Sequence, residues 1–185
     1  MKIYYILLLS ILFLACNERE AITANGIIDK AIAEACKGNC DDAAIEFVFR
    51  KVKYKSTRQG GNFQYERNFI DSTGSVRDVI NNKGFSRFIN DSLQQLADTT
   101  ANKYAESVNS VHYFAQLPYG LNAAAANKEL LGEAVIKDKE YYEIGVTFSE
   151  EGGGTDFEDT FVYWVDKSTF HVDYLAYSYA VNGGG

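Results

Sequence analysis

Basic and metal-binding residues are scarce in this chain of 185 residues. Eighteen Lys and Arg stand against 25 Asp and Glu, which gives a formal net charge of -7, and there are two histidines. An acidic surface repels nucleic acid and gains no electrostatic attraction to anionic lipid. Proline occurs once, whereas 14% of the residues are aromatic, and this composition argues against disorder. We therefore expect a folded protein that does not bind nucleic acid.

The motifs of common hydrolases and nucleotide-binding enzymes are also missing. The sequence holds no GxSxG, no HExxH and no glycine-rich phosphate loop followed by Lys and Ser or Thr. His112 and His171 are distant in sequence from the cysteines, so a four-ligand zinc site is not expected. The acidic segment 150–159 offers oxygen ligands for calcium but lacks the EF-hand spacing, which favours a solvated hairpin loop. We predict no catalytic residue, no metal and no cofactor, and do not favour an enzyme.

The N-terminal segment predicts export and lipidation. One lysine is followed by an apolar run from Ile3 to Ala15, and Cys16 comes directly after it. As a helix this run would span about 20 Å, which is short of the ~30 Å hydrocarbon layer. We interpret residues 1–15 as a signal peptide, Cys16 as the lipidated residue and residues 16–20 as a short tether, in preference to an ordinary secretory signal. The predicted location is the outer membrane of the cell envelope, on its periplasmic face or exposed at the surface.

The remaining cysteines, Cys36 and Cys40, are separated by three residues. The compartment outside the inner membrane is oxidising, so we predict a local disulfide, with free thiols as the alternative. Closing so short a loop would stabilise the fold by only about 2 kcal/mol in the chain-entropy model.

Hydrophobic periodicity predicts one α+β domain over residues 21–185. A 3.6-residue pattern predicts a helix at 21–36, and a period of two with glycine turns predicts short antiparallel strands between residues 44 and 96. A second helix is expected at 99–114, within a helical insert that extends to residue 131. Longer strands follow at 132–136, 140–149, 159–166 and 171–180. We expect a curved antiparallel sheet packed on the N-terminal helix and the helical insert.

Aromatic residues concentrate in these last strands and suggest a place for an apolar ligand. Strand alternation puts Phe161, Tyr163 and Val165 on one face and Val162 and Trp164 on the other, so both faces are partly apolar. One face can cover the helices, while the other is covered by the insert or holds a ligand. The candidate ligand-lining residues are Tyr142, Phe148, Tyr163, Trp164, Tyr174 and Tyr177.

Several segments resemble an uncharacterised family of envelope lipoproteins from Bacteroidota. They are residues 109–122, residues 142–154, the Phe-Val-Tyr-Trp of 161–164 and the Asp-Tyr-Leu-Ala-Tyr of 173–177. The order of elements more weakly resembles the periplasmic lipoprotein carriers of the Lol system, which implies a half-barrel around helices that holds acyl chains. No functional residue of those carriers matches here. Relatives continue beyond the strand at 173–179, which leaves open whether this chain is truncated at its C terminus.

Together these features predict a membrane-anchored envelope lipoprotein that binds an apolar or lipid-like ligand. The alternative is an envelope interaction or scaffold module with a filled core and no ligand cavity. A hollow of roughly 300 Å³ or more, lined by apolar side chains, would favour the first.

Overall fold

A computed structural model describes residues 22–153 and 157–179. The predicted signal peptide, Cys16 and the tether lie outside the described residues. The elements, in chain order, are α1 (Ala24–Cys36), β1 (Ala43–Phe49), β2 (Val52–Gln59), β3 (Asn62–Asp71), β4 (Gly74–Asn81), β5 (Gly84–Ile89), β6 (Ser92–Leu93), α2 (Asp98–Ala115), a 3-10 turn (Tyr119–Asn122), β7 (Ala126–Ile136), β8 (Lys139–Phe148), β9 (Thr160–Asp166) and β10 (Val172–Ser178).

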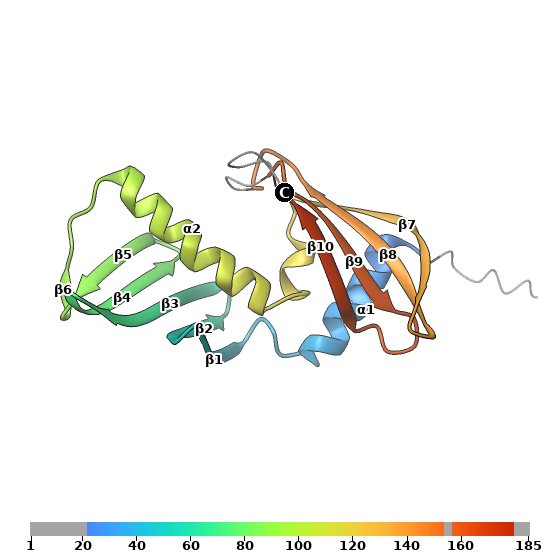
Figure 1. The fold of residues 1–185 in the computed structure, drawn as a ribbon, viewed down its shortest axis with the longest axis horizontal. Helices are drawn as coiled ribbons and strands as arrows, with labels where there is room; N and C mark the ends of the chain where they lie inside the picture. The colour runs from blue at the N-terminus through green and yellow to red at the C-terminus, as the bar shows by residue number, and fades with distance from the viewer. Residues whose placement is uncertain (1–21, 154–156, 180–185) are drawn as a thin grey trace, which may run out of the picture.

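The predicted α+β class with antiparallel sheets is confirmed, and the strands divide between two sheets. One sheet has the order β1-β2-β3-β4-β5-β6 and the other β10-β9-β8-β7, so neighbouring strands are also consecutive in the chain. Figure 1 shows α2 lying across the six-stranded sheet and α1 lying against the four-stranded one. The division between the sheets falls between β6 and β7, where α2 and the 3-10 turn stand in the chain.

Helix α1 begins where Thr23 caps it, with its side-chain oxygen accepting a hydrogen bond of 3.0 Å from Gly26 N. Its apolar positions Ile27, Ile28 and Ala31 are buried, and they pack with Ile144, Val146, Phe161, Tyr163 and Val165 of the four-stranded sheet. This cluster is the main core of the molecule. The helix ends at Cys36, where Lys37 takes a left-handed conformation.

Helix α2 buries little apolar surface, and a charged cluster helps to hold it on the six-stranded sheet. The Asp78 carboxylate of β4 is fully buried and accepts hydrogen bonds of 2.6 Å from both Arg67 and Arg87. Arg67 donates onward to Ser107 of α2, and the Arg87 guanidinium lies 3.5 Å from the centre of the Tyr104 ring. Because each arginine contacts both the carboxylate and the helix, the cluster ties the middle of α2 to the sheet.

The segment after α2 differs from expectation. Residues 122–131 are rich in alanine and belong to the expected helical insert, but β7 begins at Ala126 and pairs with β8 from Ala126↔Phe148. Cross-strand pairing here overrides the helical propensity of alanine. Within the described part of the chain, no helix is both long and apolar enough to cross a membrane.

Candidate functional site

An apolar groove lies between α2 and the end of the four-stranded sheet. The helix contributes a stripe of residues spaced by three and four, so that they share one face. The opposite wall comes from the ends of β8, β9 and β10 and from the loop between β8 and β9. The hollow measures about 190 Å³ and is lined by Glu106, Asn109, Ser110, Tyr113, Phe114, Phe148, Gly153, Asp159, Phe161 and Tyr177.

Aromatic rings form the inner part of this groove. The Phe114 ring centre lies 5.5 Å from that of Tyr177 and 6.2 Å from that of Phe161, and Phe148 meets Phe161 at 5.8 Å. Phe161 is buried, but Phe114 remains 39% exposed and Tyr177 49% exposed. The groove therefore presents aromatic surface to solvent although its rings already touch one another.

A second hollow adjoins the first on the other side of Phe114. It measures about 430 Å³, is more open, and shares Ser110 and Phe114 with the first; its remaining lining residues are Phe47, Val48, Phe49, Val111 and Ala115. Val48 and Phe49 of β1 are 67% and 45% exposed. The apolar surface thus runs from β10 across the C-terminal part of α2 to β1, and each of these strands is the edge of its sheet. The first hollow, at about 190 Å³, is smaller than 300 Å³, whereas the more open second hollow, at about 430 Å³, exceeds that volume.

Two phenols lie at the base of the groove. The hydroxyl oxygens of Tyr113 and Tyr163 are 3.5 Å apart, and burial raises the pKa of both groups. Both phenols are therefore neutral at physiological pH, and the base of the groove carries no charge.

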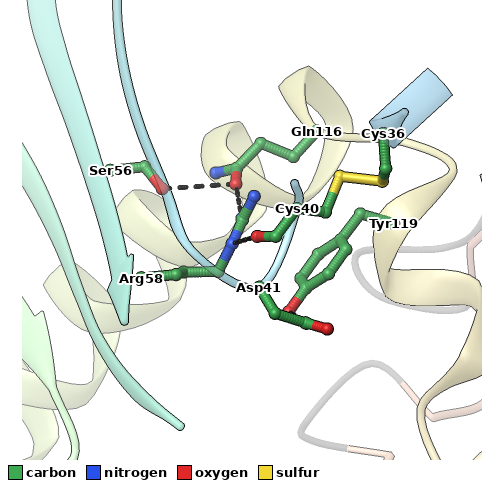
Figure 2. Close-up of a disulfide and its surroundings, with 7 residues drawn as sticks. All are labelled: Cys36, Cys40, Asp41, Ser56, Arg58, Gln116 and Tyr119. Atoms are coloured by element: carbon green, nitrogen blue, oxygen red, sulfur yellow. Dashed lines mark hydrogen bonds between the residues drawn. A yellow bond between two sulfur atoms is a disulfide. The ribbon is translucent and has the colours of Figure 1, made fainter. Parts of the chain in front are cut away.

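A hydrogen-bonded cluster fixes the C-terminal end of α2 next to the groove (Figure 2). Arg58 of β2 donates from Nε to the Cys40 carbonyl at 2.6 Å and from Nη1 to Gln116 Oε1, which also accepts from Ser56 at 3.2 Å. The Tyr119 ring covers the guanidinium at 4.0 Å. Arg58 thereby joins β2, the residue that follows α2 and the loop after α1, and we call this set the Arg58 clamp.

The Cys36–Cys40 disulfide belongs to the same junction. The structure joins the two sulfur atoms, with their Cα atoms 5.0 Å apart, and so closes the loop that presents the Cys40 carbonyl to Arg58. Figure 2 shows the disulfide beside Tyr119, whose hydroxyl donates to Asp41 at 2.8 Å. The loop is therefore held from both sides of the junction.

His112 is hydrogen-bonded to Gln116 of the Arg58 clamp and lies against the six-stranded sheet. It is fully buried, its Nδ1 lies 3.2 Å from Gln116 Nε2, and its Nε2 lies 3.0 Å from the Glu66 carbonyl. Because the amide donates to Nδ1, Nε2 carries the proton and donates to the carbonyl. Burial lowers the pKa of His112, which keeps the ring neutral where it stacks on Tyr65 at 4.6 Å. His112 is thus a packed structural residue, whereas the His171 side chain is 58% exposed near Glu34.

The structure separates the predicted lining residues into three groups. Phe148 and Tyr177 line the groove. Tyr163 is fully buried beneath it, and Tyr142 lies on the same face of the sheet but beside Phe170, with their ring centres 6.5 Å apart. Neither of these two belongs to the groove wall.

Trp164 and Tyr174, also predicted to line a ligand site, lie outside this groove. They are paired across β9 and β10, and they face away from the core side that Phe161, Tyr163 and Val165 occupy. The Trp164 indole N–H donates to Glu143 at 2.8 Å, while the Tyr174 ring meets Tyr141 at 5.6 Å. Because strand side chains alternate, filling the core with the odd-numbered residues of β9 places Trp164 on the other face.

Sequence reasoning missed the helical wall. The stripe from Glu106 to Phe114 lies within the helix predicted at 99–114, but none of its residues was among the predicted lining residues. Spacing by three and four from Phe114 back to Ser110 and Glu106 was the available signal. No cluster of potential metal ligands occurs in residues 22–153 and 157–179.

Comparison with known proteins gives a family but no activity. A family model described as "Family of unknown function (DUF6503)" matches residues 2–185. No curated protein matches the sequence. A LolA superfamily protein from Nitrosomonas europaea is similar in structure, with 16% identity, a TM-score of 0.49 and coverage of 89% of this chain and 74% of the other. The lipoprotein LppX from Mycobacterium tuberculosis shows 13% identity, a TM-score of 0.36 and coverage of 86% and 90%. Neither likeness identifies a ligand for this chain.

Proposed function

Since the chain belongs to the DUF6503 family of unknown function, we propose its function from its own geometry: it is an envelope lipoprotein whose groove beside α2 binds an apolar or lipid-like ligand. The observation that supports this most is the exposure of Phe114 and Tyr177 inside a concave aromatic surface. Apolar rings that could be covered by the fold, yet are held at the wall of a hollow, mark binding surfaces more often than scattered exposed residues do.

Burial of apolar surface would favour binding of a ligand in this groove. Removing apolar surface from water contributes about 25 cal/mol per Å², so a ligand that covers about 200 Å² of groove and ligand surface gains about 5 kcal/mol before the entropy of association is subtracted. An alkyl chain can gain this without any specific hydrogen bond. The net affinity then depends on how rigid the groove is before binding.

The Arg58 clamp supplies that rigidity. Gln116 immediately follows α2 and is fixed by Arg58 and Ser56, so the last turn of the helix, which carries Tyr113 and Phe114, keeps its position without ligand. A wall that is already in place does not lose conformational entropy on binding. This supports a pocket that is formed in advance rather than one that closes around its ligand.

The anchoring part of the proposal rests on residues 1–16, with Cys16 as the acylated residue in the outer membrane of a Bacteroidota cell. Two or more acyl chains are needed for stable attachment, because the net charge of -7 gives no attraction to anionic lipid. Cys16→Ser should move the protein from the membrane pellet to the soluble envelope fraction. A variant that still pellets with the membrane contradicts acyl anchoring.

The ligand part is tested by mass spectrometry of protein purified gently from membranes. Covalent acyl groups remain under denaturing conditions, whereas a bound ligand leaves, so the native mass should exceed the denatured mass by that of one apolar molecule. Equal masses would contradict a resident ligand and favour the alternative, an envelope interaction or scaffold module.

A further inference from the structure

The α2 stripe changes in polarity along its length. From the N-terminal side it presents a carboxylate at Glu106, an amide at Asn109, a hydroxyl at Ser110 and then the rings of Tyr113 and Phe114. Phe114 lies eight residues after Glu106, a rise of about 12 Å along the helix, which is the scale of one head group followed by several methylene groups. On the basis of the proposed function, we infer that the groove takes a single-chain amphiphile with a cationic head group, its tail on the aromatic rings and its head at Glu106.

The charge of the groove mouth supports a cationic head. Two carboxylates, Glu106 and Asp159, are among the residues that line the first hollow, and they come from opposite walls. No Lys, Arg or His is among the described residues that line either hollow. An anionic head placed beside Glu106 would meet like charge, whereas an ammonium group gains a favourable interaction there.

The basic side chains near α2 are used elsewhere. Arg67 and Arg87 are bound to Asp78, and Arg58 is held by Cys40 and Gln116. Lys103 of α2, three residues before Glu106, lines neither hollow. The guanidinium of Arg50 lies 5.0 Å over the Phe49 ring of the second hollow. An anionic ligand could be held there only with its head towards β1, which is the reverse orientation and a distinct outcome of the test.

The size of the groove supports a single chain. The first hollow, at about 190 Å³, is smaller than the 300–1,000 Å³ typical of sites for drug-sized ligands. The second, more open hollow offers a continuation past Phe114 for the end of the same chain. The rings of Phe114 and Tyr177, with their centres 5.5 Å apart, touch each other, so a chain would lie along their exposed faces and not between them.

The test compares three amphiphiles that share a dodecyl chain and differ in charge: dodecylammonium, dodecyl maltoside and dodecanoate. Each displaces N-phenyl-1-naphthylamine from the protein at pH 7, below its critical micelle concentration and at low salt. We expect dodecylammonium to bind about fivefold more tightly than dodecanoate, because Glu106 is exposed and an exposed carboxylate contributes modestly. The preference should fall as salt is raised.

Glu106→Gln keeps the shape of the side chain and removes its charge, so it should reduce the ratio between the two affinities by about threefold while dodecyl maltoside binds as before. Asp91→Asn, at the exposed turn between β5 and β6, removes the same charge far from the groove and should leave the ratio unchanged. Equal reduction by both variants would mean that net charge, and not the site, sets the preference. Tighter binding of dodecanoate would overturn the cationic head but leave the apolar groove standing, whereas no displacement by any of the three would overturn the proposed function itself.

Discussion

Arg58 shows how one residue can fix the wall of a groove that it does not touch. Its side chain is 7% exposed, and two of its nitrogens are hydrogen-bonded to the loop after α1 and to the end of α2. Its Nη2 is buried with no hydrogen-bond partner in the described structure. A buried cation with one unsatisfied nitrogen is a costly arrangement, which is tolerated because the other contacts connect three segments.

Arg58→Met should lower the free energy of unfolding by about 1–3 kcal/mol, because the Cys40 carbonyl and the Gln116 amide lose their donor while most of the side-chain volume is kept. The loss of the unsatisfied nitrogen offsets part of this cost. Urea unfolding followed by circular dichroism measures the change. Lys53→Met, which removes an exposed charge from the same strand, should stay within about 0.5 kcal/mol of wild type. Equal stability of the two variants would show that the Arg58 clamp does not contribute to the free energy of unfolding.

At the same scale, Trp164 illustrates that the sequence alone does not predict which face of a strand is buried. Alternation along β9 separates Trp164 from Phe161 and Tyr163, and that separation is confirmed by the core that Phe161 and Tyr163 form. Alternation alone does not say which face is the core, because both faces are partly apolar. The decisive contact, between the Trp164 indole and Glu143 of β8, depends on strand register and is invisible in a single sequence.

At the scale of elements, the long periodic segments were predictable and the partition of the sheet was not. The helix predicted at 99–114 is α2 at Asp98–Ala115, and the hairpins follow their glycine and asparagine turns. The start of β7 at Ala126 was missed, because alanine carries no strand signal and β8 supplies the pairing.

Helix α2 packs on the six-stranded sheet with one face and lines the groove with another, and this explains its weak apolar pattern. One face is bound to the six-stranded sheet through Tyr104, Val108 and His112, with the Asp78 cluster beside it. The other face presents the Glu106 to Phe114 stripe to the groove. A helix that is shared between a charged attachment and a half-exposed aromatic wall lacks the single apolar stripe from which burial is usually predicted.

At the scale of the whole molecule, the groove lies where the two sheets approach each other. Figure 1 shows the C-terminal part of α2 reaching from the six-stranded sheet towards the four-stranded sheet that contains β10. The Arg58 clamp and the Phe114–Tyr177 contact are links across this junction, one of them polar and the other aromatic. The proposed site is therefore formed by α2 together with the four-stranded sheet, and neither of them forms it alone.

The central claim is that this junction binds an apolar chain on Phe114 and Tyr177, and a titration with N-phenyl-1-naphthylamine tests it most directly. Tyr177→Ser removes a half-exposed ring from the groove wall, and Ile70→Ser removes an apolar side chain that is 84% exposed on β3, away from the groove. We predict saturable binding to wild type, about fivefold weaker binding to Tyr177→Ser and unchanged binding to Ile70→Ser, with urea midpoints confirming that all three proteins are folded. Equal affinity of the probe for all three proteins, or no saturable binding to wild type, would contradict the account.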